Sequence, residues 1–119
     1  MERAVPILPA NDLAAAKAFY TKLGFRVTFE GEIRDEGKSG IMGVERGTIA
    51  LTIDAPMSGH GRDACVSLVV DDADKYYDEW SAKVSIAQPP RDEYWNARTF
   101  GFQDPSGNTI FVIGPPKRP

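Results

Sequence analysis

The feature that most constrains the fold of this chain is an internal repeat with an offset of 60 residues. Identities are few, but apolar, polar and turn residues stay in step in the aligned pairs: Gly47–Ile53 with Gly107–Ile113, Asn11-Asp12 with Asp71-Asp72, Leu8 with Leu68, Tyr20 with Trp80 and Val5 with Cys65. Self-similarity at a fixed period indicates a repeated structural unit. We therefore interpret residues 1–119 as one domain built from two modules, about 1–59 and 60–119.

The first module predicts the element order β-α-β-β-β. Asn11 or Asp12 can cap a helix whose apolar residues recur at helical spacing as far as Leu23, and Gly24 is a good helix stop. The stretch 31–39 is polar and contains glycine, so it predicts a loop. The predicted strands are Val5–Leu8, Phe25–Phe29, Gly40–Glu45 and Thr48–Asp54.

The second module predicts the same order. Asp71 or Asp72 can cap a helix in which Tyr76, Tyr77 and Trp80 pack against the core. The predicted strands are Ala64–Val70, Val84–Ala87, Arg98–Gln103 and Asn108–Ile113, with a long loop from Pro89-Pro90 and a tight turn at Asp104–Gly107. The fold class is therefore α+β, with helices covering one side of mostly antiparallel strands.

Composition excludes several classes of function. The chain is 42% hydrophobic and 26% charged, which is typical of a globular protein, and no apolar run approaches the roughly 20 residues that span a bilayer. The net charge is −3 and the basic residues are scattered, so there is no basic stripe for nucleic acid. A single cysteine excludes an internal disulfide, and we expect a reduced, cytoplasmic setting without membrane or nucleic-acid partners.

Two runs carry a resemblance to a known family. Phe19–Phe25 resembles the FY-x-x-LGF run of the vicinal oxygen chelate superfamily (glyoxalase, bleomycin resistance and dioxygenase proteins), and Asp104–Asn108 resembles the DP-x-GN turn before its last strand. The resemblance implies two βαβββ modules whose strands form a curled mixed sheet around a cleft. Since fold does not fix function, the residues of the cleft must decide the activity.

The resemblance also locates four positions that bind metal in the metal-dependent members. Carried over by the repeat, they fall on Val5, Leu51, Cys65 and Phe111. Three of these residues have no ligand atom, and one thiol cannot hold a divalent cation, which needs several convergent donors. We therefore expect no metal and no cofactor.

Among metal-free members, the chain is most similar to the bleomycin-binding resistance proteins. The run Ala4–Leu8, with Pro6 at the bend, looks like their N-terminal arm, Tyr77–Ser81 matches their second helix, and Trp95 with Arg98 resembles the pair before their seventh strand. This resemblance implies a homodimer with exchanged arms. It would sequester a cationic glycopeptide antibiotic of the bleomycin type in clefts at the subunit interface, without modifying it.

The residues expected to contact such a ligand are aromatic or charged. Aromatic rings can stack on the flat tail of the drug, and carboxylates attract its positively charged end. The candidates are Phe29, Glu30, Glu32, Asp35, Tyr94, Trp95, Arg98 and Phe100. Each also has a simpler interpretation: Phe29 as a core residue, the acidic run as a solvated loop, Trp95 as a loop anchor, and Arg98 as a member of an ion pair.

The sequence is also compatible with an alternative function. Ile41 and Met42 occupy the place where the family has a second stacking aromatic, so the chain could instead be an enzyme or a binding protein of the same superfamily acting on another small flat toxin or metabolite. His60, in the linker Ser58–Gly61, is interpreted as a surface histidine. Cys65 is interpreted as a small buried residue at the cleft wall.

Overall fold

The computed structural model describes residues 2–55 and 63–117, so the prediction for His60 lies outside the described residues. The chain forms two compact units. Unit 1 comprises the chain up to Ala64 together with the turn Asp104–Asn108, and unit 2 comprises Cys65–Gln103 and the chain from Thr109 onward. The turn between the last two strands therefore belongs to the first unit, although its flanking strands belong to the second.

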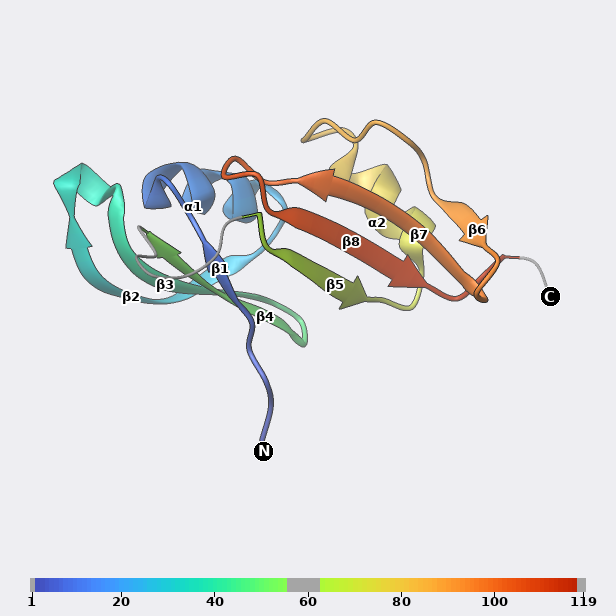
Figure 1. Ribbon diagram of the computed structural model, residues 1–119, viewed down its shortest axis with the longest axis horizontal. Helices are drawn as coiled ribbons and strands as arrows, with labels where there is room; N and C mark the ends of the chain where they lie inside the picture. The colour runs from blue at the N-terminus through green and yellow to red at the C-terminus, as the bar shows by residue number, and fades with distance from the viewer. Residues whose placement is uncertain (1, 56–62, 118–119) are drawn as a thin grey trace. The chain divides into compact units, whose positions relative to one another are not determined.

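Unit 1 is a four-stranded sheet with one long helix (Figure 1). Its strands lie in the order β1-β4-β3-β2, with β1 parallel to β4 and the other pairs antiparallel. Its elements are β1 (Ile7–Pro9), α1 (Leu13–Lys22), β2 (Arg26–Arg34), the 3₁₀ turn η1 (Asp35–Gly37), β3 (Ser39–Arg46) and β4 (Ile49–Ala55).

Unit 2 repeats this arrangement with the order β5-β8-β7-β6, in which β5 runs parallel to β8. Its elements are β5 (Cys65–Val69), α2 (Ala73–Trp80), β6 (Arg91–Glu93), β7 (Ala97–Gln103) and β8 (Thr109–Gly114). The predicted α+β class and the mixed sheets are confirmed, with one four-stranded sheet in each unit. No helix in the described ranges is long and apolar enough to cross a membrane.

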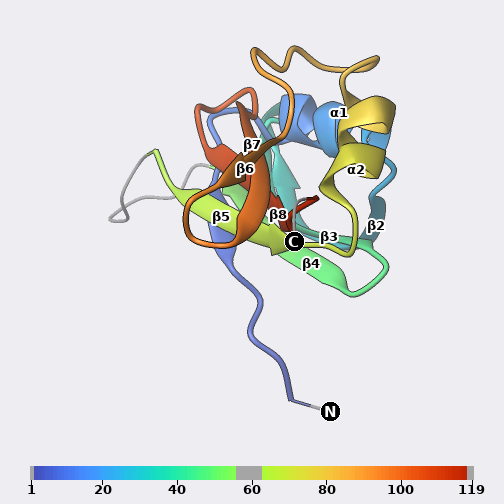
Figure 2. The ribbon, with the colours of Figure 1, turned by 90° about the vertical axis from the view of Figure 1, so that its right-hand side faces the viewer.

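Matching side chains begin and bury the two helices. Asp12 Oδ1 accepts the backbone amide of Ala15 at 3.1 Å, and Asp72 Oδ1 accepts that of Lys75 at 3.3 Å, so both caps occupy the predicted pairs. Each helix buries one face on its own sheet (Figure 2). The fully buried side chains there include Tyr20, Met42, Val44, Leu51 and Ile53 in unit 1, and Trp80, Ile110 and Val112 in unit 2. Within the described residues, no helix covers the opposite face of either sheet, which we call the open face.

Residues 31–39, which were predicted to form a loop, have a different structure. β2 continues to Arg34, Gly31 pairs with Ile41, and Arg34 pairs with Ser39, so the segment is a β-hairpin closed by η1. The turn is made by residues with positive φ, including Asp35 and Gly37. The sequence hid this strand because β2 is an edge strand that exposes most of its side chains, which removes the apolar alternation.

The predicted strand at Val84–Ala87 is also wrong. The residues that pair with β7 are Arg91–Glu93, inside the predicted loop, with Asp92 opposite Arg98. A three-residue edge strand composed only of charged residues has no apolar pattern to detect.

A buried carboxylate, Asp104, holds the turn between β7 and β8 in unit 1. Asp104 Oδ1 accepts the backbone amides of Ser106 at 2.9 Å and Asn108 at 3.0 Å. Asp104 Oδ2 accepts the Tyr20 hydroxyl at 2.7 Å and Asn108 Nδ2 at 2.9 Å. Asn108 Nδ2 also donates to the carbonyl of Pro9 at 2.8 Å. One carboxylate thus joins the last turn to α1 and, through Asn108, to β1.

Replacing Tyr20 tests this network. Tyr20→Phe removes one donor from a buried charged acceptor, so we expect the free energy of unfolding to fall by about 2 kcal/mol at pH 7. Burial, then the charge of Asp104 and the hydrogen bond to it, raise the pKa of Tyr20 above its ordinary value. Because the folded state favours the neutral phenol, this stabilisation is complete below about pH 10 and is lost as the pH rises further.

Denaturant unfolding between pH 7 and pH 11 measures both effects. We expect the stability of the wild-type protein to fall more steeply above pH 10 than that of Tyr20→Phe. Tyr94→Phe is the matched control, because the Tyr94 side chain is 98% exposed and should change neither quantity. Parallel curves for wild type and Tyr20→Phe would contradict the assignment.

Candidate functional site

On the open face of each sheet, a half-exposed phenylalanine lies beside a glycine of the neighbouring strand. In unit 1, Phe29 is 49% exposed and pairs with Gly43, where an added Cβ would overlap the Phe29 ring. In unit 2, Phe111 is 42% exposed and pairs with Gly101, where an added Cβ would come within 3.2 Å of the Phe111 Cδ1 atom. The missing side chain of each glycine leaves the space that the ring occupies.

The open face of unit 2 is hollowed beside Phe111. A depression of about 270 Å³ is lined by residues that include Gln88, Arg91, Glu93, Thr99, Gly101 and Phe111, and we call it the Phe111 cleft. A second hollow, of about 590 Å³, adjoins it, since the two share Gly101 and Phe111. The exposed ring therefore stands between two depressions, in a position to contact a bound molecule.

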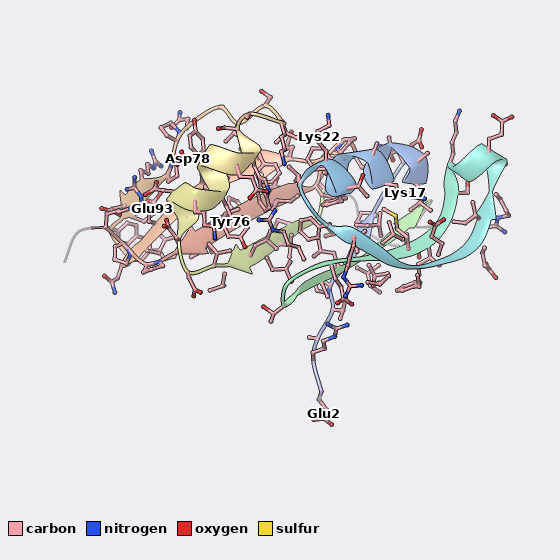
Figure 3. All side chains as sticks on the ribbon, turned by 180° about the vertical axis from the view of Figure 1, so that it is seen from behind. Glu2, Lys17, Lys22, Tyr76, Asp78 and Glu93 are labelled. Carbon is pink, nitrogen blue, oxygen red and sulfur yellow. The ribbon has the colours of Figure 1, made fainter. Side chains whose placement is uncertain are left out.

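The wall of the Phe111 cleft carries a carboxylate and a guanidinium from β6. Glu93 Oε1 accepts the hydroxyl of Thr99 at 3.2 Å and Arg91 Nε at 3.1 Å (Figure 3 labels Glu93). The Glu93 side chain is 20% exposed and that of Arg91 72% exposed. Among the described residues, nothing accepts a hydrogen bond from the terminal nitrogens of Arg91. The wall thus offers a fixed acceptor and free donors beside an aromatic ring.

Behind β6, charged side chains join the strand to the rest of unit 2. Arg98 Nε donates to both carboxylate oxygens of Asp74, at 3.1 and 3.2 Å, and its Nη1 donates to Asp92 at 3.3 Å. The backbone amide of Lys117 donates a hydrogen bond to Asp92 Oδ1 at 3.0 Å. Its Nζ atom forms an ion pair with Asp74 Oδ2, also at 3.0 Å. Partial burial acts to raise the pKa of Asp74, but the hydrogen bonds and charges of Lys117 and Arg98 outweigh it and lower the pKa overall.

Comparison with family models gives a match to the Glyoxalase/Bleomycin resistance protein/Dioxygenase superfamily over residues 3–112. The chain belongs to this superfamily. A search of curated proteins gave no match. The superfamily includes both enzymes and binding proteins, so membership leaves the activity open.

Solved structures with this fold include three proteins connected with bleomycin. A bleomycin resistance determinant encoded on the transposon Tn5 is 25% identical, with a TM-score of 0.77, over 97% of this chain and 98% of that one. A bleomycin-binding protein complexed with bleomycin is 27% identical, with a TM-score of 0.73, over 96% and 98%. The bleomycin-binding protein of Streptomyces verticillus, complexed with copper(II)-bleomycin, is 28% identical, with a TM-score of 0.76, over 96% of both chains.

An enzyme shares the fold at lower identity. The lactoylglutathione lyase of Agrobacterium tumefaciens is 18% identical to this chain, with a TM-score of 0.73, over 96% of this chain and 94% of that one. At this identity the likeness shows the fold alone. The function of this chain therefore has to be inferred from the chemistry of its cleft.

The predicted contacts in unit 2 lie in different places. Tyr94 and Trp95 form the turn between β6 and β7, 98% and 50% exposed, and neither lines the Phe111 cleft. Phe100 borders the cleft, but it is buried and its ring packs against Tyr77 and Phe102. Arg98 forms ion pairs with carboxylates, one of the two interpretations that its sequence position allowed.

The residues of unit 1 that were predicted to contact a ligand also lie in different surroundings. Glu30 accepts Lys17 Nζ at 2.8 Å, so its charge is paired with α1 (Figure 3 labels Lys17). Asp35 accepts the Ser39 hydroxyl at 2.9 Å and closes the hairpin turn. Glu32 lines a small hollow of about 170 Å³. Among the predicted residues of this unit, Phe29 is the one that presents an exposed aromatic ring on the open face.

In the predicted arm, Ala4, Pro6 and Ile7 are exposed, whereas Leu8 is buried in the core of unit 1. The carbonyl of Pro6 accepts the backbone amide of Thr52 at 2.9 Å, which continues the pairing of β1 with β4 of the same chain. Exchange of this arm with a second subunit stays a prediction. Figure 1 shows the chain before β1 running away from the sheet of unit 1.

The assignment of one metal-ligand position by the sequence repeat, that of Leu51, is wrong. Leu51 is buried in the core, whereas Thr52 lies on the open face opposite Ile7. Ser67, the repeat partner of Ile7, lies opposite Phe111, so the structural counterpart of Phe111 is Thr52 rather than Leu51. The sequence repeat followed the glycines of the hairpins and slipped by one residue, which exchanges the two faces of a strand.

The remaining metal-ligand positions have different settings. Val5 precedes β1, and Cys65, expected to be buried, is exposed. Within residues 2–55 and 63–117, no three His, Cys, Asp or Glu side chains converge as metal ligands would. Sequence reasoning did not select Phe111 as a ligand contact because both faces of β8 carry apolar residues. The signal that could have found it is Gly101 on the paired strand.

The two tryptophans offer a test of the exposure of the β6–β7 turn. Trp80 is fully buried and Trp95 half-exposed. We expect acrylamide to quench the emission of Trp95 strongly, because a collisional quencher has to reach the ring, and to quench that of Trp80 weakly. In Trp95→Phe, the remaining emission should be blue-shifted and resistant to the quencher. Equal quenching of wild type and Trp95→Phe would contradict this arrangement.

Proposed function

We propose that this protein is an antibiotic-binding protein that sequesters bleomycin-family glycopeptides as a homodimer, without modifying them. The observation that carries the proposal is the Phe111 cleft, where a half-exposed ring stands beside the Glu93 carboxylate and the Arg91 guanidinium. Relatives of 25–28% identity over nearly the whole chain support it, and two of these hold bleomycin or its copper(II) complex.

The physical argument follows from the chemistry of the cleft wall. A flat heteroaromatic ring that stacks on Phe111 gains about 0.5–1.5 kcal/mol beyond the burial of its surface. The carboxylate of Glu93 attracts a cationic group and raises the rate of association. Arg91 can donate hydrogen bonds to carbonyl groups of the ligand. Sequestration requires binding alone, so these contacts suffice for the proposed activity.

Further contacts would come from the residues that the resemblance indicated. Phe29 supplies a second exposed ring in unit 1, and Trp95 an exposed ring on the β6–β7 turn. Pro6 and the segment before it would form the exchanged arm of the dimer. A cleft shared between subunits is also what a chain of 119 residues needs to enclose a large ligand.

One observation favours a different ligand. Ile41 on β3 lines the small hollow beside Glu32, at the place where the resemblance to bleomycin-binding resistance proteins implies an aromatic ring. With an aliphatic side chain there, a smaller planar ligand would fit the superfamily cleft. The second candidate function is therefore a binding protein or enzyme for another small flat toxin or metabolite.

Titration with metal-free and copper(II)-loaded bleomycin tests the proposal. Calorimetry on the wild-type protein should show saturable binding at two sites per dimer. Phe111→Leu keeps an apolar side chain but removes the aromatic face, so we expect the dissociation constant to rise about threefold to tenfold, in line with the loss of one stacking contact. Phe111→Tyr keeps the ring and should bind like the wild type.

The outcomes separate the candidates. Binding that weakens equally in Phe111→Leu and Phe111→Tyr would show that the ring does not stack on the ligand. Absence of binding in both metal states would exclude bleomycin and favour the second candidate function. A monomer at micromolar concentration in sedimentation analysis would exclude the proposed dimer.

A further inference from the structure

The strand β6 forms a wall of the Phe111 cleft, yet it is the least supported strand of unit 2. It has three residues, lies at the edge of the sheet and pairs with β7 alone. Its first and last residues, Arg91 and Glu93, line the cleft. Asp92 between them contacts Arg98 and Lys117. Alternate residues of a strand point to opposite faces, so Asp92 holds the strand from behind.

The contacts of Asp92 reach elements outside its own hairpin. Its side chain is one-tenth exposed and accepts Arg98 Nη1 at 3.3 Å and the Lys117 backbone amide at 3.0 Å. Arg98 and Lys117 both also bind Asp74, which lies in the first turn of α2. The four charges therefore connect β6 to α2, to β7 and to the segment after β8.

We propose that Asp92 is a positioning residue for the Phe111 cleft, which through Arg98 and Lys117 holds β6 so that Arg91 and Glu93 stay on the cleft wall. Arg98 suits this role because its planar guanidinium binds Asp74 through Nε and Asp92 through Nη1 at once. A lysine, with a single ammonium group, cannot span both carboxylates in this way.

The variants Asp92→Asn and Arg98→Lys test the proposal. The first keeps the shape of the side chain and removes its charge, and the second keeps the charge and removes the fork. Asp78→Asn is the matched control for Asp92→Asn, because it changes the net charge by the same amount. Asp78 is an exposed residue of α2 (Figure 3). Among the described residues, none forms a hydrogen bond or an ion pair with the side chain of Asp78.

Amide hydrogen exchange is the first measurement, and it does not depend on any ligand. We expect the protection factors of the amides of residues 91–93, which are exchange rates corrected for the intrinsic rate of each sequence, to fall about fivefold in Asp92→Asn and in Arg98→Lys. The protection factors of the amides of β5 and β8 should remain as in the wild type. The wild-type protein in 1 M salt should approach the variants, because high ionic strength screens the charges. Asp78→Asn should exchange as the wild type does.

Two results would overturn the proposal at this point. Unchanged exchange at 91–93 would show that Asp92 does not hold the strand. Equal acceleration throughout unit 2 would show that the network serves the stability of the unit as a whole, without a particular effect on β6.

Binding of metal-free bleomycin is the second measurement, and this arm rests on the proposed function. We expect the dissociation constant to rise about threefold to tenfold in Asp92→Asn, although no residue of the cleft wall is changed, because a mobile wall costs ordering free energy on binding. Affinity equal to that of the wild type, with faster exchange at 91–93, would overturn the positioning role. If the wild-type protein does not bind bleomycin, the proposed function fails, and the exchange measurement alone decides the role of Asp92.

Discussion

The buried carboxylate of Asp104 accepts four hydrogen bonds, two from the backbone of its own turn and one each from Tyr20 and Asn108. A buried charge is tolerated when its lone pairs are satisfied by donors of this kind. Asn108 extends the network to the carbonyl of Pro9 at the end of β1. Because its amide group donates to two oxygens, the orientation of the Asn108 side chain is determined. Helix α1 and strand β1 of unit 1 are thus joined to the turn between β7 and β8.

Much of this fold could be predicted from the sequence because strong local signals agree with one another. The caps Asp12 and Asp72, the buried pair Tyr20 and Trp80, and the order of elements in each module follow from the repeat and from helical spacing. Where such signals are absent, prediction failed. The edge strand β2 and the charged strand β6 have little apolar alternation, and each is formed by pairing with the next strand of its own hairpin.

The site was harder to predict because it depends on which face of a strand a residue occupies. The repeat aligned Leu51 with Phe111, but the first is in the core and the second on the open face. A shift of one residue between the modules reverses the face while leaving the apolar character unchanged. Arg98 shows the same difficulty, because its position at the start of β7 could serve a ligand or an ion pair. Its distances to Asp74 and Asp92 were needed to assign the pair.

The place of the turn Asp104–Asn108 also has a consequence for the order in which the chain acquires its structure. Tyr20 and Asp104 are 84 positions apart, so a hydrogen bond of the first unit joins the beginning of the chain to its last quarter. During synthesis, residues 2–55 emerge before their carboxylate partner exists, and the Tyr20 hydroxyl and the Pro9 carbonyl must be solvated by water until then. Contacts of such long sequence separation slow folding and leave a partly folded chain exposed to aggregation. Unit 1 is therefore complete only after the turn Asp104–Asn108, which lies within the second half of the chain, has been synthesised.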